Sequence, residues 1–97
     1  TGRKVQAKEA MSMGLINRVV EPDSLMDEAM GYIDALKANG PFAVQMIKRS
    51  VYEGLEVGLK EAFEKELDLG LQVFASEDAI EGPIAFLEKR KPNFKGR

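Results

Sequence analysis

The sequence contains no cysteine and no histidine, and each absence excludes a class of chemistry. Without cysteine there is no disulfide framework and no thiolate metal site. Without histidine the chain lacks the commonest general base and the commonest metal ligand. No apolar run approaches the ~20 residues of a membrane span, and no signal-peptide pattern opens the chain. We therefore expect no metal site and no membrane attachment.

The 97 residues, of which 44% are hydrophobic, suffice for one small domain or for part of a larger one. The first residue is Thr1 rather than methionine, which is what a piece of a longer protein would show. We expect the chain to be such a piece.

The charge is unevenly distributed along the chain. Residues 89–97 hold five basic residues and no acidic one, although the formal net charge of the whole chain is −2. A basic tail on an acidic body indicates either a solvated terminus or a specific contact with an anion. The overall balance argues against a protein that binds nucleic acid with its whole surface.

Hydrophobic spacing predicts a mainly all-α chain of about five short helices with one brief strand near residues 15–20. Gly14 stands where a first helix would take a left-handed C-cap, and Ser76 stands where the final segment would take an N-cap. Proline disfavours the helical conformation in the residue before it, so Gly82–Pro83 predicts a break with a fresh start at Pro83. The expected helices are 7–13, a second capped by Asp23 or Ser24 and stopped by Asn39–Gly40, Pro41 to Gly54, about Val57 to Ala75, and the stretch after Ser76.

The strand prediction depends on residues 15–20, which are rich in β-branched side chains and are followed by Glu21–Pro22. No other segment has a convincing strand pattern. This strand must therefore pair with a sheet outside the chain or remain without a partner.

Many carboxylates are present, but none lies in a context that marks it as a catalytic acid or base. Glu61, Glu64 and Asp68 share one helix face, which is typical of a solvated surface. Asp78 is interpreted as a residue of the first turn of a helix. There is no glycine-rich phosphate loop and no Ser-His-Asp arrangement. We expect no catalytic residue in this segment.

Phe86 and Lys89 are the candidate binding residues. They are three apart, which makes them neighbours on one helix face, and further cations follow them. An aromatic ring beside clustered cations suits a ligand with a flat base and phosphates. The alternative is that Phe86 packs in the core and that the lysines are solvated.

Three stretches, taken together, resemble the C-terminal region of the enoyl-CoA hydratase/isomerase (crotonase) family. Their order, spacing and closing string carry the resemblance, which covers essentially the whole chain. The stretches are Thr1 to Val20, Asn39 to Val44 with Lys48–Arg49, and Phe74 to Arg97 with its Ala-Phe-Leu-Glu-Lys-Arg-Lys-Pro string.

The resemblance implies the helical C-terminal region of a crotonase-type α/β spiral fold. Residues 1–22 would join the sheet of the missing core, and residues 23–97 would form a helical region that builds trimers, which pair into hexamers. Members act on acyl-CoA thioesters without a further cofactor, by hydration, isomerisation or related reactions. An oxyanion hole of two backbone N–H groups stabilises the enolate, and it would lie upstream of Thr1. The isolated segment is expected to be inactive.

The family also implies a role for the closing helix. In its hydratases a Phe and a Lys there reach the coenzyme A (CoA) of a neighbouring subunit, and the matching positions are Phe86 and Lys89. Gly70 departs from the family, since a bulkier residue there often lines the acyl pocket, and Pro83 is unusual inside the last helix. The implied location is the cytoplasm, or an organelle matrix in a eukaryote.

Two other hypotheses stay open on the sequence. The chain could be a stand-alone helical interaction module whose basic tail binds nucleic acid or an acidic partner. Its apolar stripes, without a core to cover them, could instead make the segment self-associate. The choice of acyl-CoA and of reaction within the family depends on side chains of the core, upstream of Thr1.

Overall fold

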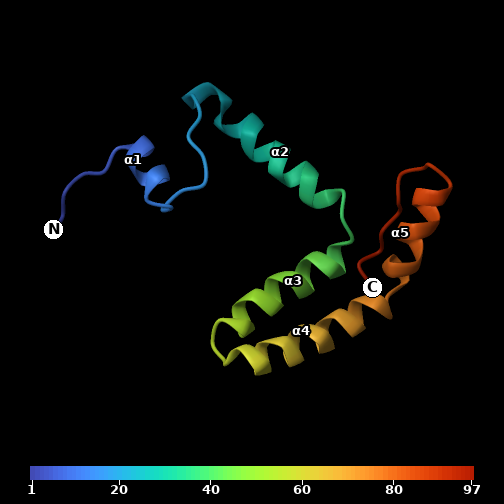
Figure 1. Ribbon diagram of the computed structural model, residues 1–97. Helices are drawn as coiled ribbons and strands as arrows, with labels where there is room; N and C mark the ends of the chain where they lie inside the picture. Colours follow the sequence, from blue (N-terminus) through green and yellow to red (C-terminus); the bar gives the residue numbers. More distant parts are fainter. The chain divides into compact units, whose positions relative to one another are not determined.

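Five α-helices and one short 3₁₀-helix make up the secondary structure of the computed structural model, which describes all of residues 1–97 (Figure 1). The mainly helical prediction is confirmed. The chain divides into two compact units, Thr1–Tyr32 and Ile33–Arg97, which we describe separately. The elements are α1 (Ala7–Ser12), η1 (Pro22–Ser24), α2 (Leu25–Lys37), α3 (Pro41–Gly54), α4 (Leu59–Phe74) and α5 (Glu77–Leu87).

In the first unit, α1 ends in the left-handed cap that the sequence predicted. Gly14 has a φ of 75°, and its N–H donates to the carbonyl oxygen of Met11 at 3.0 Å. The N–H of Leu15 donates to the carbonyl oxygen of Ala10 at 2.9 Å. These two bonds define a Schellman motif, and glycine adopts its left-handed position without a steric penalty.

The strand expected over residues 15–20 is absent, so that prediction is wrong for this chain. Residues 15–17 form a bend, and residues 18–20 have no regular structure. A strand needs a hydrogen-bonded neighbour, and no other segment of the chain supplies one. Arg18 is instead fixed through its side chain, which pairs with Glu28 and lies 5.9 Å from the centre of the Tyr32 ring.

In the second unit, α3 and α4 form a helical hairpin whose two arms lie side by side (Figure 1). Proline begins α3 at Pro41, as predicted, because the first helical turn does not need its missing N–H. The helices approach closely where a Cβ on Gly54 would lie 3.6 Å from the Cβ of Ala62. Leu69 is only 4% exposed and is the one large apolar side chain that is buried.

The apolar stripe of α4 is not covered by this chain. Its side chains are between 59% and 81% exposed, because the face of α4 that packs on α3 is a different one. Five large apolar side chains exposed along one helix face are unusual in a complete soluble domain. Such a face is typical of a surface that another segment of the protein or another subunit covers. The stripe consists of Leu59, Phe63, Leu67, Leu71 and Phe74.

The final helix begins as expected and continues further than expected. Ser76 caps α5, since its side-chain oxygen accepts the N–H of Ala79 at 3.2 Å. The break expected at Gly82–Pro83 is wrong, because α5 runs through both residues to Leu87. Proline clashes with the backbone N–H and the Cβ of its predecessor, and Gly82 lacks the Cβ, so part of the clash is absent. None of the five helices combines the length and apolar composition needed to cross a membrane.

Candidate functional site

The turn that follows α5 has a strained backbone at one of the two candidate residues. Lys89 has a φ of 54° and is the only residue other than glycine with a positive φ. Its N–H donates to the carbonyl oxygen of Phe86 at 3.2 Å, and the N–H of Arg90 donates to that of Ala85 at 3.0 Å. These bonds form a second Schellman motif, in which lysine takes the place usually held by glycine. A left-handed conformation costs such a residue about 1–2 kcal/mol.

Both candidate residues present free side chains. Phe86 is 82% exposed, so it does not pack in a core formed by this chain. Lys89 takes part in none of the ion pairs or side-chain hydrogen bonds of the structure. It lies just beyond the helix rather than on it, which corrects the expected helical spacing. The backbone bond to Phe86 nevertheless keeps the two residues together at the end of α5.

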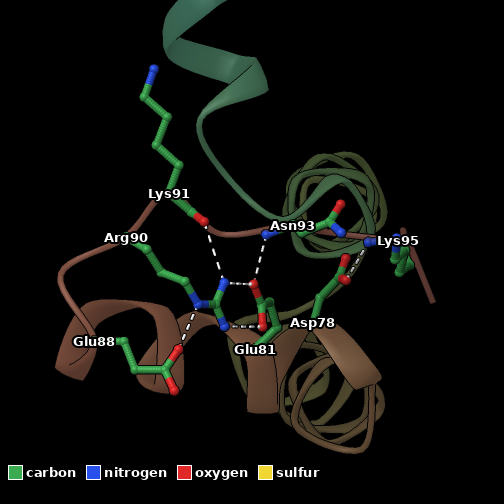
Figure 2. A network of polar contacts seen from close by, with 7 residues as sticks. All are labelled: Asp78, Glu81, Glu88, Arg90, Lys91, Asn93 and Lys95. Carbon is green, nitrogen blue, oxygen red and sulfur yellow. Dashed lines mark hydrogen bonds and ion pairs between the residues drawn. The ribbon is translucent and has the colours of Figure 1, made fainter.

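The neighbouring arginine is fixed by a polar network, which Figure 2 shows from close by. Arg90 donates to both carboxylate oxygens of Glu81, from Nη1 at 2.5 Å and from Nη2 at 2.9 Å. Its Nε donates to Glu88 at 2.6 Å, and its Nη1 also reaches the carbonyl oxygen of Lys91 at 3.3 Å. A paired fork of this kind is the strongest common geometry between arginine and a carboxylate.

The charge state of this network is set by its contacts. The Arg90 guanidinium, followed by the backbone N–H of Asn93, lowers the pKa of Glu81 from 4.5 to about 2. The same pairing with Glu81, and then with Glu88, raises the pKa of Arg90 above its usual value. Glu81 and Arg90 are therefore both charged at neutral pH, and their pairing persists there.

A second carboxylate holds the tail that follows the turn. Asp78 is only 6% exposed, and it accepts the backbone N–H of Lys95 at 2.6 Å and that of Gly96 at 2.8 Å. The N–H of Glu77 donates to the carbonyl oxygen of Arg97 at 2.8 Å, so the tail reaches the first turn of α5. Residues 90–97 thus run back along α5 and are bonded to it from its middle to its start.

The tail also packs through its aromatic residue. The ring of Phe94 lies 3.8 Å from where a Cβ on Gly82 would be, and 3.9 Å from the corresponding point on Gly40. Gly96 has a φ of 76°, and a Cβ there would come within 3.3 Å of Pro41. The contacts at Gly82 and Gly40 are ordinary van der Waals distances, whereas Gly96 has both a left-handed φ and a tight approach to Pro41, which favour glycine at that position.

The tail uses some of its cations internally and leaves others free. Arg90 pairs with Glu81 and Glu88, and Arg97 pairs with Glu77 at 3.1 Å. Lys89, Lys91 and Lys95 have no carboxylate partner among the ion pairs of this unit, and the side chain of Lys91 extends away from the network (Figure 2). The cations of the tail without a carboxylate partner are therefore all lysines.

The other carboxylates considered from the sequence lie on the solvated face expected for them. Lys65 reaches Glu61 at 3.6 Å, Lys60 reaches Glu64 at 3.9 Å, and Gln72 donates to Asp68 at 3.0 Å. No group of three or more acidic side chains is arranged to hold a metal ion.

Gly70 opens a space rather than admitting a close neighbour from this chain. No atom lies within 4 Å of where its Cβ would be. A cavity of about 200 Å³ is found here between α3 and α4, and it is lined mainly by apolar side chains such as Ile47, Leu69 and Val73.

Sequence reasoning missed three residues of the site, namely Asp78, Glu81 and Arg90. Asp78 was expected only to favour the start of the helix, whereas it is the buried anchor of the tail. The available signal was the pair of opposite charges, Glu81 and Arg90, which lie on either side of the end of α5 at Leu87.

The whole chain, residues 1–97, matches the enoyl-CoA hydratase/isomerase family, and the chain belongs to that family. The resemblance noted from the sequence is thereby confirmed. Enoyl-CoA hydratase EchA19 of Mycobacterium tuberculosis is 48% identical over 97 residues, which are 100% of this chain and 36% of that protein. Carnitinyl-CoA dehydratase of Proteus mirabilis is 40% identical over 102 residues, which cover 100% of this chain and 39% of that protein.

A solved structure shows the same arrangement. The enoyl-CoA hydratase of Bacillus anthracis matches with a TM-score of 0.94 and 34% identity, over 99% of this chain and 37% of that one. The chain thus spans less than two fifths of the length of the relatives it matches.

Proposed function

We propose that this chain is the closing, helical part of an enzyme that acts on acyl-CoA thioesters by hydration, isomerisation or a related reaction. Family membership over residues 1–97 supports the proposal. The reaction centre, with its oxyanion hole of backbone N–H groups, would lie in polypeptide that precedes Thr1. In this proposal the 97 residues alone have no activity, and the substrate is the CoA thioester, with no further cofactor.

Within this enzyme, Phe86 and Lys89 contact CoA. The observation that carries this assignment is the exposure of Phe86, 82%, beside a lysine that has no carboxylate partner. The ring offers a face to the adenine base, and the ammonium group offers a charge-assisted hydrogen bond to a phosphate. A base and a phosphate lie close together in CoA, so the pair of residues fits one end of that molecule.

The segment also contributes to assembly. The apolar stripe of α4 is exposed in this chain. In this proposal, the core of the enzyme and the neighbouring subunits of a trimer or hexamer pack against it. Residues 1–22 join the core and residues 23–97 form the assembly region. The cytoplasm, or an organelle matrix in a eukaryote, remains the predicted location.

The experiment is a kinetic comparison of Lys89→Ala with the parent protein, with Lys60→Ala as a control that removes an equal charge from α4. Lys89→Ala should raise KM for a short enoyl-CoA more than it lowers kcat, because the phosphates are remote from the reacting carbon. Lys60→Ala should change neither. An unchanged KM in Lys89→Ala would remove Lys89 from the site.

The rival hypothesis, a helical module whose tail binds nucleic acid or an acidic partner, makes a different prediction. It requires binding to arbitrary DNA or RNA that weakens steeply with salt. Two of the five tail cations already pair with acids of α5, which leaves fewer for a phosphate backbone. We expect no such binding from the parent protein, in a titration with a labelled DNA duplex at two salt concentrations.

A further inference from the structure

The conformation of Lys89 is unfavourable by itself and must be maintained by its surroundings. A lysine has no intrinsic preference for a φ of 54°, and strained residues of this kind persist only where neighbouring contacts determine them. Upstream of Lys89, the two Schellman bonds to Phe86 and Ala85 hold the turn. On the C-terminal side of Lys89, the turn must be held by contacts of the residues that follow it.

Glu81 is the centre of the downstream contacts. It receives three hydrogen bonds, two from Arg90 at 2.5 and 2.9 Å and one from the backbone N–H of Asn93 at 2.7 Å. Its side chain is 21% exposed, and it projects from the middle of α5, which is a rigid support. The residue after Lys89 is therefore fixed to the helix that comes before it (Figure 2).

The two adjacent cations consequently have different environments. Arg90 donates to Glu81 from both terminal nitrogens, to Glu88 from Nε and to the carbonyl oxygen of Lys91, so four of its five N–H donors are used. Lys89 has no carboxylate partner and keeps its three donors available for a ligand. A ligand that binds a side chain whose backbone is already fixed loses less conformational entropy than one that must order a mobile turn.

We propose that Glu81 and Arg90 are positioning residues that hold Lys89 in its left-handed turn, so that its ammonium group is directed at a CoA phosphate. This inference rests on the proposed function, since it concerns the same lysine. Neither Glu81 nor Arg90 touches the ligand. They act through Lys89, and the pair is distinct from Asp78, which fastens the end of the tail.

The test is a double-mutant cycle in the parent enzyme with the variants Glu81→Gln, Lys89→Ala and the combination of both. Two substrates are compared, a short enoyl-CoA and the same acyl group on pantetheine, which lacks the nucleotide and its phosphates. Glu81→Gln should raise KM for the CoA substrate about fivefold with kcat unchanged. It should leave KM for the pantetheine substrate unchanged, and it should add nothing when Lys89 is already alanine.

The opposite results overturn the inference. If Glu81→Gln raises KM equally in the presence and absence of Lys89, or equally for both substrates, the pair only fastens the tail. A Lys89→Ala variant with unchanged KM defeats the proposed function and this inference together, whereas an effect of Lys89→Ala without one of Glu81→Gln defeats the inference alone.

One further variant controls for loosening of the tail. Glu77→Gln breaks the other ion pair of the tail, between Glu77 and Arg97, without touching the turn, and it should leave both KM values unchanged. A rise in KM in Glu77→Gln equal to that in Glu81→Gln would show that loosening the tail at any point weakens binding, and it would overturn the inference.

Discussion

Lys89 and Phe86 are joined by a backbone hydrogen bond of 3.2 Å that closes the end of α5. The left-handed conformation of Lys89, with a φ of 54°, then turns the next N–H, that of Arg90, back to the carbonyl oxygen of Ala85 at 3.0 Å. A residue that destabilises its own turn and leaves its side chain free is typical of a position retained for binding rather than for stability. Stability and affinity should therefore respond in opposite directions to one substitution.

That substitution is Lys89→Gly. Glycine removes the steric cost of the left-handed turn, so the free energy of unfolding should rise by about 1 kcal/mol. KM for the CoA substrate should rise as well, because the ammonium group is lost. Lys89→Ala is the matched control, since it loses the same group and keeps the strained backbone; it should show the higher KM without the gain in stability. Urea unfolding and steady-state kinetics provide the two measurements.

Glu81 should make the stability of the protein depend on pH in the acid range. Its pKa is about 2 in the folded protein, against an ordinary value of 4.5, because Arg90 and the N–H of Asn93 stabilise the carboxylate. A carboxyl group with a lowered pKa stabilises the fold fully above its unfolded pKa, and this contribution is lost as the pH falls towards the folded value. Unfolding in urea from pH 6 to pH 2.5 should show a loss that begins near pH 4.5 and is smaller in Glu81→Gln. Equal losses in both proteins would contradict this assignment.

Asp78 should control whether the tail stays attached. Asp78→Ala removes the acceptor of two backbone N–H groups, and hydrogen bonds to a charged group contribute about 1.5–3 kcal/mol each. We expect the end of the tail to detach locally and to become sensitive to trypsin at the Lys95–Gly96 bond, whereas Lys91 precedes a proline and is not cleaved. Glu77→Ala, which changes the neighbouring exposed carboxylate, should leave the cleavage rate near that of the parent protein. Equal cleavage of all three proteins would show that Asp78 does not hold the tail.

The variant Gly70→Ala tests whether another segment or subunit packs against α4 at residue 70. Within this chain nothing lies within 4 Å of the new methyl group, and alanine in a helix interior is favoured over glycine by about 1 kcal/mol. Thermal unfolding should therefore shift to a higher temperature. Gly96→Ala is the contrasting variant, because its φ of 76° and the 3.3 Å approach to Pro41 should make it destabilising. A loss of stability in Gly70→Ala would mean that another segment or subunit packs against the glycine.

The features that the sequence predicted well depend on local rules. Gly14 ends α1 and Ser76 begins α5 because each satisfies backbone groups within a few residues of itself. Pro41 likewise starts α3, because its ring fixes φ near the helical value and its missing N–H is not needed in the first turn. Such rules need only a short window of sequence, so the order of the helices could be derived without a structure.

The features that escaped prediction depend on residues far apart in the sequence or outside the chain. Asp78 became an anchor because residues 95 and 96 fold back onto it, which no helical pattern records. The run at residues 15–20 has strand composition, but pairing needs a second strand that this chain lacks. At Gly82–Pro83 the rule for proline was applied without allowing for the missing Cβ of its predecessor.

The return of the tail along α5 places Arg97 at the opposite end of the helix from the turn that carries Lys89. Arg97 is hydrogen-bonded at the first turn of an 11-residue helix, whereas Lys89 lies past its last. At 1.5 Å per residue the two points are about 16 Å apart. A fluorophore attached at Arg97 would therefore report detachment of the tail from the first turn of α5 while leaving the turn at Lys89, at the opposite end of the helix, uncovered.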